Sequence, residues 1–219
     1  MNDPAAENLD LLAPSTDELA ELEASITELH LLLERRAQDA HMLDLAYTTV
    51  DSPVGSLLLA ASDRGLVRVA YAVEDHDAVL ETLSQRISAR ILRAPRRLDT
   101  VAAELEQYFA GTRRAFDVPL DPSLSSGFRR LVQQHLPDIA YGSTETYKEV
   151  AALVGNPQAV RAVGSACATN PLPVVVPCHR VLRSDGSLGG YIGGLAAKAA
   201  LLELESAGAG VSPAARPGV

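Results

Sequence analysis

One cysteine is followed directly by a histidine, and this pair is where the sequence offers nucleophilic chemistry. Cys178 and His179 come after the short apolar run 172–176, which we interpret as a buried strand. A thiolate is a strong nucleophile, and an imidazole can accept the proton of the thiol. Adjacent side chains on an extended chain point to opposite faces, so a water or a local twist would have to connect the two. A dipeptide of this kind is a weak signal by itself, because a buried cysteine is often only a small core residue.

A histidine that acts as a base usually needs a third group to orient it. Glu205, at the end of a predicted closing helix over residues 195–205, is the candidate if the fold brings that helix back. We interpret the other cysteine, Cys167, as a small buried residue. The two cysteines and five histidines lack the paired spacing of a zinc site. We therefore expect neither a metal ion nor another cofactor.

The elements that must position these residues fall into two groups. In the first half, short apolar segments separated by turn residues predict three strands, and two helices follow. This pattern indicates a small α+β unit in which helices pack against a sheet. Prolines and serines around residues 119–126 then mark a linker. The predicted strands are 45–50, 57–61 and 66–72, and the predicted helices are 77–90 and 98–110.

The second half is predicted to be mainly helical. Residues 143–154 and 158–169 are two predicted helices joined by the tight turn Gly155-Asn156-Pro157, which is the outline of a helix-turn-helix. An earlier helix is expected over 127–135. Asn170-Pro171 ends the last of these helices, because a proline disfavours helical backbone in the residue before it. A glycine-rich loop over 186–194 precedes the closing helix.

The net charge of −9 argues at first against a nucleic-acid partner, because phosphate contacts need lysine and arginine. Its distribution changes that conclusion. Residues 1–45 contain eleven acidic side chains and two arginines, which leaves seventeen acidic and seventeen basic residues in the remainder. The acidity therefore belongs to an N-terminal extension. We expect a cytoplasmic protein, because the chain shows no secretory signal and no apolar run long enough to cross a membrane.

Within the extension, a helix is predicted from Thr16, the capping candidate, to about Arg36. Leu19, Leu22, Ile26, Leu29 and Leu33 form an apolar stripe along it. This stripe either packs on the protein's own domain, which we favour, or makes a short coiled coil with a second chain. Fewer than three heptads are present, which weakens the coiled-coil interpretation.

The residues around Cys178 resemble one known family closely. The similarity covers about residues 45–206, and the core P-C-H-R-V, with Asn170 before it and Gly190-Tyr191 after it, is highly specific. On these motifs the chain resembles the O6-alkylguanine-DNA alkyltransferases. The matching stretches are S-P-V-G-S-L-L-L-A-A-S-D-R-G-L, Y-F-A-G-T-R-R-A-F-D-V-P-L, Y-G-S-T-E-T-Y, R-A-V-G-S-A-C-A-T-N-P-L-P-V-V-V-P-C-H-R-V and G-S-L-G-G-Y-I-G-G-L-A-A-K.

The resemblance implies a repair reaction in which Cys178 takes the alkyl group from O6-alkylguanine in DNA, irreversibly and once per protein molecule. O4-alkylthymine is a second candidate substrate. A water would link Cys178 to His179, Glu205 would hold the histidine, and this network would make a thiolate at neutral pH. Asn170 would hold the turn before the active-site strand.

The resemblance also implies how the damaged base is reached. The O6 atom is inaccessible inside the stacked duplex, so the guanine must be flipped into a pocket. Arg161 would fill the vacated place, and the small residues Gly164 and Ser165 on the same helix face would permit close approach to the minor groove. Tyr147 would press on the phosphate 3′ to the lesion. The pocket would be lined by Tyr147, Tyr191, Val181 and Ile192, with the Tyr191 hydroxyl donating to the purine.

Two positions depart from the family pattern. Gln133 stands where the family usually has tryptophan, and Ala140 replaces a proline. Both changes concern the support of the helix-turn-helix rather than the chemistry.

Three other functions compete with alkyl transfer: a non-catalytic damage sensor, a transcriptional regulator and a cysteine hydrolase. The presence of Cys178 argues against the sensor, and the short acidic extension argues against the regulator.

The sequence thus predicts an α+β protein with a ribonuclease H-like sheet-plus-helices domain followed by a mostly helical domain with a helix-turn-helix. The predicted partner is double-stranded DNA containing O6-alkylguanine, bound through its minor groove, and we expect a monomer with no membrane contact. The predicted segments are an acidic helical extension (1–44), the α/β domain (45–120), the DNA-binding and alkyl-transfer domain (121–206) and a disordered tail (207–219).

Overall fold

A computed structural model describes residues 15–210 of the chain, which divides into two compact units, Met1–Leu43 and Asp44–Val219. The first unit contains α1 (Thr16–Asp39). Its N-cap is Ser15 rather than the predicted Thr16, because the Ser15 hydroxyl accepts a hydrogen bond from the Glu18 N–H while the Glu18 carboxylate accepts one from the Ser15 N–H. The predicted apolar stripe on α1 is present and exposed. What packs against it stays a prediction.

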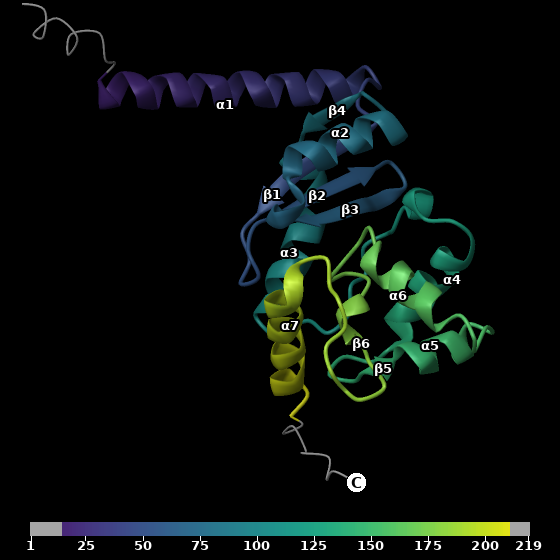
Figure 1. The fold of residues 1–219 in the computed structure, drawn as a ribbon. Coiled ribbons are helices and arrows are strands. Elements are labelled where there is room, and N and C mark those ends of the chain that lie inside the picture. The colour runs from purple at the N-terminus through teal and green to yellow at the C-terminus, as the bar shows by residue number, and fades with distance from the viewer. Residues whose placement is uncertain (1–14, 211–219) are drawn as a thin grey trace, which may run out of the picture. The chain divides into compact units, whose positions relative to one another are not determined.

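The second unit begins with a four-stranded sheet (Figure 1). Its order is β3-β2-β1-β4, with antiparallel β1–β2 and β2–β3 pairs and a parallel β1–β4 pair. The three predicted strands are found within a residue of their expected bounds. The fourth strand is missing from the prediction because three residues are too few to show an alternating pattern. The strands are β1 (Leu45–Val50), β2 (Leu57–Ser62), β3 (Gly65–Tyr71) and β4 (Ile91–Arg93).

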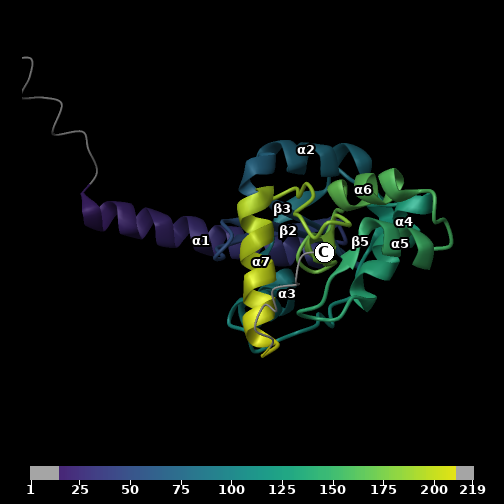
Figure 2. The same cartoon turned by 60° about the horizontal axis from the view of Figure 1, so that its bottom comes forward.

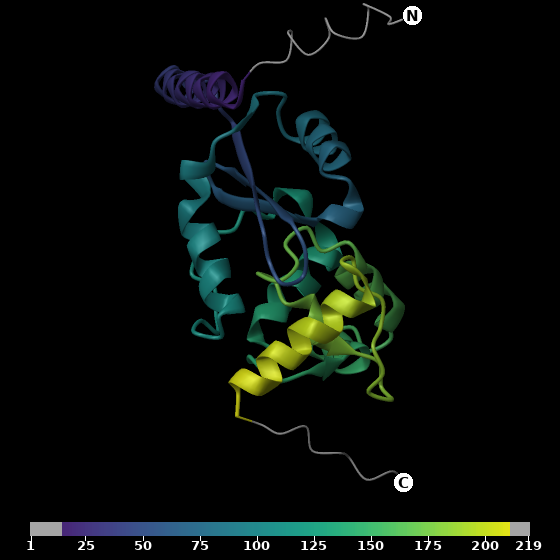
Figure 3. The same cartoon turned by 90° about the vertical axis from the view of Figure 1, so that its left-hand side faces the viewer.

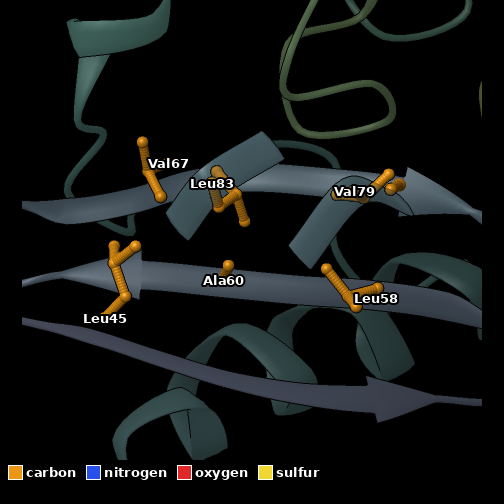
Figure 4. Close-up of a cluster of buried hydrophobic side chains, with 7 residues drawn as sticks. Leu45, Leu58, Ala60, Val67, Val79 and Leu83 are labelled. Carbon is orange, nitrogen blue, oxygen red and sulfur yellow. The ribbon is translucent and has the colours of Figure 1, made fainter. Parts of the chain in front are cut away.

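Two helices, α2 (His76–Arg86) and α3 (Asp99–Phe109), lie on opposite faces of this sheet (Figure 3). The central strand β2 is apolar on both faces for this reason. Leu58 and Ala60 meet Val79 and Leu83 of α2 in one buried cluster (Figure 4). Helix α2 is shorter than predicted, since the chain after it must extend to form β4.

The outer edge of β3 joins the sheet to the helical half of the unit. The Leu66 N–H donates to the Pro119 carbonyl at 2.8 Å, and the Val69 N–H donates to the Pro171 carbonyl at 2.9 Å. Gly65 has a φ of +136°, and a side chain there would collide with the Pro119 carbonyl. These bonds satisfy an otherwise open sheet edge and hold the linker and the segment after Asn170 against the sheet.

The helical half contains three helices that pack together, α4 (Gly127–His135), α5 (Tyr147–Leu153) and α6 (Val160–Ala168) (Figure 2). Helix α5 begins later than predicted because Thr146 and Glu149 form a capping box at its start. The remaining elements are β5 (Glu145–Thr146), β6 (Val181–Leu182), α7 (Gly194–Gly208) and the 3-10 turns Ala72–Glu74, Pro95–Leu98, Pro122–Leu124, Leu136–Asp138 and Cys178–Arg180.

The α+β fold class predicted from the sequence is confirmed: a sheet with helices is followed by a mainly helical region. Helix α7 continues three residues beyond the predicted end at Glu205. Residues 1–14 of the predicted extension and residues 211–219 of the predicted tail lie outside the described residues. Within residues 15–210, no helix is both long and apolar enough to span a membrane.

Candidate active site

The segment before Cys178 is a buried turn, not the strand that the sequence predicts over 172–176. Pro171 and Pro173 lack the N–H groups that a strand ladder needs. The Asn170 side chain replaces those bonds: its Oδ1 accepts from the Leu172 N–H at 3.1 Å, and its Nδ2 donates to the Val176 carbonyl at 2.7 Å. The strand prediction was therefore wrong, because an apolar run shows burial but not backbone conformation.

Asn170 also contacts the candidate nucleophile itself. Its Nδ2 lies 3.2 Å from Cys178 Sγ, in a site where the cysteine is 2% exposed. Burial raises the pKa of the Cys178 thiol to about 11, while the Asn170 hydrogen bond and the nearby Lys198 charge act in the opposite direction. Burial thus opposes the thiolate that the resemblance implies, while Asn170 and Lys198 favour it, and the thiolate stays a prediction.

An Asn170→Ala variant tests the role of this side chain in holding the turn. The substitution leaves the buried Leu172 N–H without its partner, at a cost of about 1–3 kcal/mol, and removes one of the two hydrogen bonds to the Val176 carbonyl, which still accepts from the Cys178 N–H. We expect the free energy of unfolding in urea to fall by about 2–4 kcal/mol. Asn156→Ala, at an exposed turn, is the control. Equal unfolding free energies for wild type and Asn170→Ala would contradict this role.

His179 follows within the same 3-10 turn and meets the carboxylate of Glu205. Nε2 of His179 lies 2.9 Å from Oε1 of Glu205, and both side chains are almost fully buried. The structure thus brings together the pair that the sequence could only suggest. Burial lowers the pKa of His179, and the Glu205 carboxylate only partly opposes that effect. The imidazole is therefore neutral at physiological pH.

Glu205 accepts from several further donors. Arg180 forms a fork with it, Nε to Oε2 and Nη2 to Oε1, both at 2.9 Å. The Tyr108 hydroxyl donates to Oε1 at 2.7 Å, and the Gly142 N–H donates to Oε2 at 3.1 Å. Burial alone would raise the pKa of Glu205, but the hydrogen bonds from His179 and Arg180 lower it to about 2.

The charge on Glu205 fixes the tautomer of the histidine. An ionised carboxylate has no proton to give, so the neutral imidazole must donate its proton from Nε2. Nδ1 then carries the lone pair. This atom is buried and has no hydrogen-bond partner among the residues that the structure describes. The arrangement leaves Nδ1 of His179 available as a base.

Three residues of this network were not identified as site residues from the sequence. Arg180 and Tyr108 contact Glu205, and Lys198 donates from Nζ to the Val181 carbonyl at 2.6 Å while lying fully buried. Lys198 and Glu205 lie seven residues apart on the buried face of α7, and a lysine on such an apolar face is a usable sequence signal. Tyr108 gave no such signal, because it comes from α3 in the other half of the unit.

Of the predicted pocket residues, Tyr191 lies beside His179, whereas Ile192 lines a cavity whose walls do not include Cys178. Tyr191 has its ring centroid 6.4 Å from that of His179. Val181 is fully buried in β6, directly after the Cys178–Arg180 turn. Tyr147 begins α5, with the Lys198 ammonium 6.0 Å from its ring centre. Ile192 is half-buried and lines a cavity that also touches Thr169 at the end of α6.

Helix α6 presents the predicted contact residues on one exposed side. Arg161, Ser165 and Ala168 are exposed and Gly164 is half-buried, while Val163 and Cys167 point into the core. Burial of Cys167 agrees with its interpretation as a small core residue. The exposed side of α6 is therefore small apart from one long cationic side chain.

The helix-turn-helix is also supported where the sequence departs from the family pattern. Gln133 of α4 is buried, donates from Nε2 to the Ala166 carbonyl at 3.2 Å and accepts a hydrogen bond from the Ser125 hydroxyl. It thereby links α4 to α6 and to the linker. A polar bridge thus stands at the position where the family usually has tryptophan.

Two family models match adjacent parts of the chain. The ribonuclease-like domain of 6-O-methylguanine DNA methyltransferase matches residues 45–122, and the DNA-binding domain of the same enzyme matches residues 127–207. The chain belongs to the 6-O-methylguanine DNA methyltransferase family. The resemblance recognised from the P-C-H-R-V core is thereby confirmed.

Individual members of this family agree along most of their length. The methylated-DNA–protein-cysteine methyltransferase of Methanosarcina barkeri is 39% identical over 159 residues, covering 73% of this chain and 96% of that protein. The crystal structure of the Mycobacterium tuberculosis O6-methylguanine methyltransferase superposes with a TM-score of 0.66 at 37% identity, covering 78% of this chain and 96% of that chain. The crystal structure of the same organism's OGT in complex with DNA superposes with a TM-score of 0.65 at 38% identity, covering 74% of this chain and 94% of that chain. The acidic extension, residues 1–44, lies outside both family models.

Proposed function

We propose that Cys178 is the residue of this methyltransferase that receives the alkyl group from DNA. Membership of the family establishes the reaction, DNA repair by transfer of an alkyl group from alkylated guanine to a protein cysteine. Sγ attacks the alkyl carbon, the bond from that carbon to O6 breaks, and a thioether forms. Water does not readily hydrolyse a thioether, so each molecule repairs one lesion. The observation that carries this assignment is the buried Cys178–Asn170 contact beside the His179–Glu205 pair.

The proton of the thiol must leave as the new bond forms. We infer that a water carries this proton from Sγ to Nδ1 of His179. The departing guanine takes up one proton, so the transfer neither releases nor consumes protons overall. The free lone pair on Nδ1 supports this route, and the Glu205 carboxylate stabilises the imidazolium that forms transiently.

The substrate reaches this buried site by base flipping. Arg161 on the exposed side of α6 enters the stack where the guanine was, since its flat cationic side chain suits stacking between bases. Gly164 and Ser165 leave room for the backbone of α6 to approach the minor groove. Tyr147 contacts the 3′ phosphate, and Tyr191, Val181 and Ile192 line the pocket. We further propose Tyr191 as the donor to the purine. O4-alkylthymine is a second candidate substrate.

We propose that the protein acts in the cytoplasm as a monomer, one copy on one lesion. Sedimentation velocity on the full chain tests the oligomeric state, and a dimer would contradict it, with the exposed stripe of α1 as the place to look. A minor-groove ligand such as distamycin should compete with the protein for undamaged duplex, whereas competition by a major-groove ligand alone would contradict minor-groove binding.

Intact and peptide mass spectrometry tests the acceptor directly. After incubation with duplex DNA carrying one O6-methylguanine, we expect one added methyl group per protein, located on the Cys178 peptide. Cys178→Ala should gain no mass, and Cys167→Ala, the matched variant at the other cysteine, should still be methylated. Selective binding to the damaged duplex without added mass would instead make the protein a damage sensor.

A further inference from the structure

One tyrosine from the sheet half of the second unit contacts a residue of the candidate pocket. Tyr71, the last residue of β3, has its hydroxyl oxygen 2.9 Å from the hydroxyl oxygen of Tyr191. The two rings meet edge to face, with centroids 5.7 Å apart and an interplanar angle of 73°. Tyr71 is only 2% exposed. Along the sequence, Tyr71 lies far from the motifs that point to the reaction, and 120 positions separate it from Tyr191.

The backbone holds Tyr71 firmly in this position. Tyr71 pairs with Leu57 of β2, and its N–H donates to Oε1 of Glu74 at 2.9 Å. Glu74 also forms an ion pair with Arg68, whose Nη1 donates to the Pro171 carbonyl at 3.3 Å. The end of β3 is therefore fixed both to its own sheet and to the turn that leads to Cys178.

The loop that carries Tyr191 is packed onto the same ring. A Cβ atom at Gly193 would lie 2.6 Å from the Tyr71 ring, so the backbone of this loop rests directly on the aromatic face. Any larger residue at 193 would push the loop and the ring apart. The glycine at this place thus reflects a close approach between the sheet domain and the loop of the pocket.

From these contacts we propose that Tyr71 is a positioning residue for alkyl transfer, acting through Tyr191. The inference rests on the proposed role of Tyr191 as the donor to the purine. A phenol has one proton and two lone pairs. When Tyr191 gives its proton to the purine, its oxygen can only accept from Tyr71, so the Tyr71 hydroxyl donates. This bond orients the Tyr191 hydroxyl and compensates its oxygen as negative charge grows on the departing guanine.

The test is a double-mutant cycle of Tyr71→Phe and Tyr191→Phe, read as the single-turnover rate of Cys178 methylation at saturating DNA. Phenylalanine keeps both rings and removes only the hydroxyls. Because one hydrogen bond is worth about 0.5–1.5 kcal/mol, we expect Tyr71→Phe to slow transfer about three- to tenfold. The Kd for the damaged duplex should stay unchanged. Tyr47→Phe, at a half-buried tyrosine packed on the sheet core, is the matched control and should react as fast as wild type.

The decisive result is the effect of Tyr71→Phe in the Tyr191→Phe background. If Tyr71 acts through Tyr191, the second substitution should cause little further loss. A wild-type rate for Tyr71→Phe, or an equal loss in both backgrounds, would overturn the inference while leaving the proposed function intact. A slower rate matched by weaker DNA binding and a lower Tm would show a purely structural role and would also overturn it. If Cys178 of the wild-type protein stayed unmethylated, by contrast, the proposed function itself would be wrong.

Discussion

A Glu205→Gln variant is expected to lose about 3–5 kcal/mol of unfolding free energy and most of its alkyl-transfer rate. Glu205 is the only counter-charge shown for the buried guanidinium of Arg180 among the described residues, and breaking a buried ion pair costs about this much. Glutamine also no longer fixes the tautomer of His179, because its amide can either accept from Nε2 or donate to it. Loss of an oriented base lowers the rate by about 100-fold or more.

Glu203→Gln, an exposed glutamate one half-turn away on α7, is the matched control and should behave as wild type in both measurements. The rate is measured by single-turnover methylation and the stability by urea unfolding. A Glu205→Gln protein that is unstable but transfers at the normal rate would contradict the role of Glu205 in orienting the base.

The same carboxylate sets a pH dependence of stability. Its pKa is about 2 in the folded protein against 4.5 as the ordinary value, so the folded state favours the ionised form. This contribution, on the order of 3 kcal/mol, is fully present above pH 4.5 and is lost as the pH falls toward 2. The difference in unfolding free energy between wild type and Glu205→Gln should therefore shrink over that range. A difference that is independent of pH would show that the pKa of Glu205 is the same in the folded and unfolded protein, and would contradict this prediction.

An Arg161→Ala variant is expected to transfer the alkyl group about ten- to a hundredfold more slowly from duplex DNA. Extruding a base costs a few kcal/mol, and the side chain that fills the vacancy offsets part of that cost. Because Arg161 is exposed on α6, its removal should leave the Tm unchanged. The measurement is the single-turnover rate on a duplex with one O6-methylguanine.

Single-stranded DNA carrying the same lesion separates base flipping from simple charge loss. Its bases are already partly unstacked, so the defect of Arg161→Ala should largely disappear there. Arg161→Lys keeps the charge without the flat guanidinium and should remain slow on duplex DNA. Arg96→Ala, an exposed arginine of the sheet domain, is the control. An equal defect on both substrates would assign Arg161 to phosphate contacts instead of base extrusion.

Local sequence patterns predicted the main elements well where the physics is local. The apolar segments of β1 and β2 and the glycine-containing turn before α6 act within a few residues, so they are visible in the chain itself. The pattern failed at residues 172–176, where an apolar run became a turn. There the Asn170 side chain and two prolines, rather than hydropathy, determine the backbone.

The sequence by itself determined the chemistry: the P-C-H-R-V core identified the family, named Cys178 as the nucleophile and suggested Glu205 as the partner of His179. Only the tertiary structure decided the environment of those groups. Burial raises the pKa of the Cys178 thiol, Arg180 and Tyr108 converge on Glu205, and Tyr71 meets Tyr191 across the two halves of the unit. These effects depend on desolvation and on contacts between residues 25 to 120 positions apart. Neither leaves a trace in local spacing, because both arise only when the chain has folded.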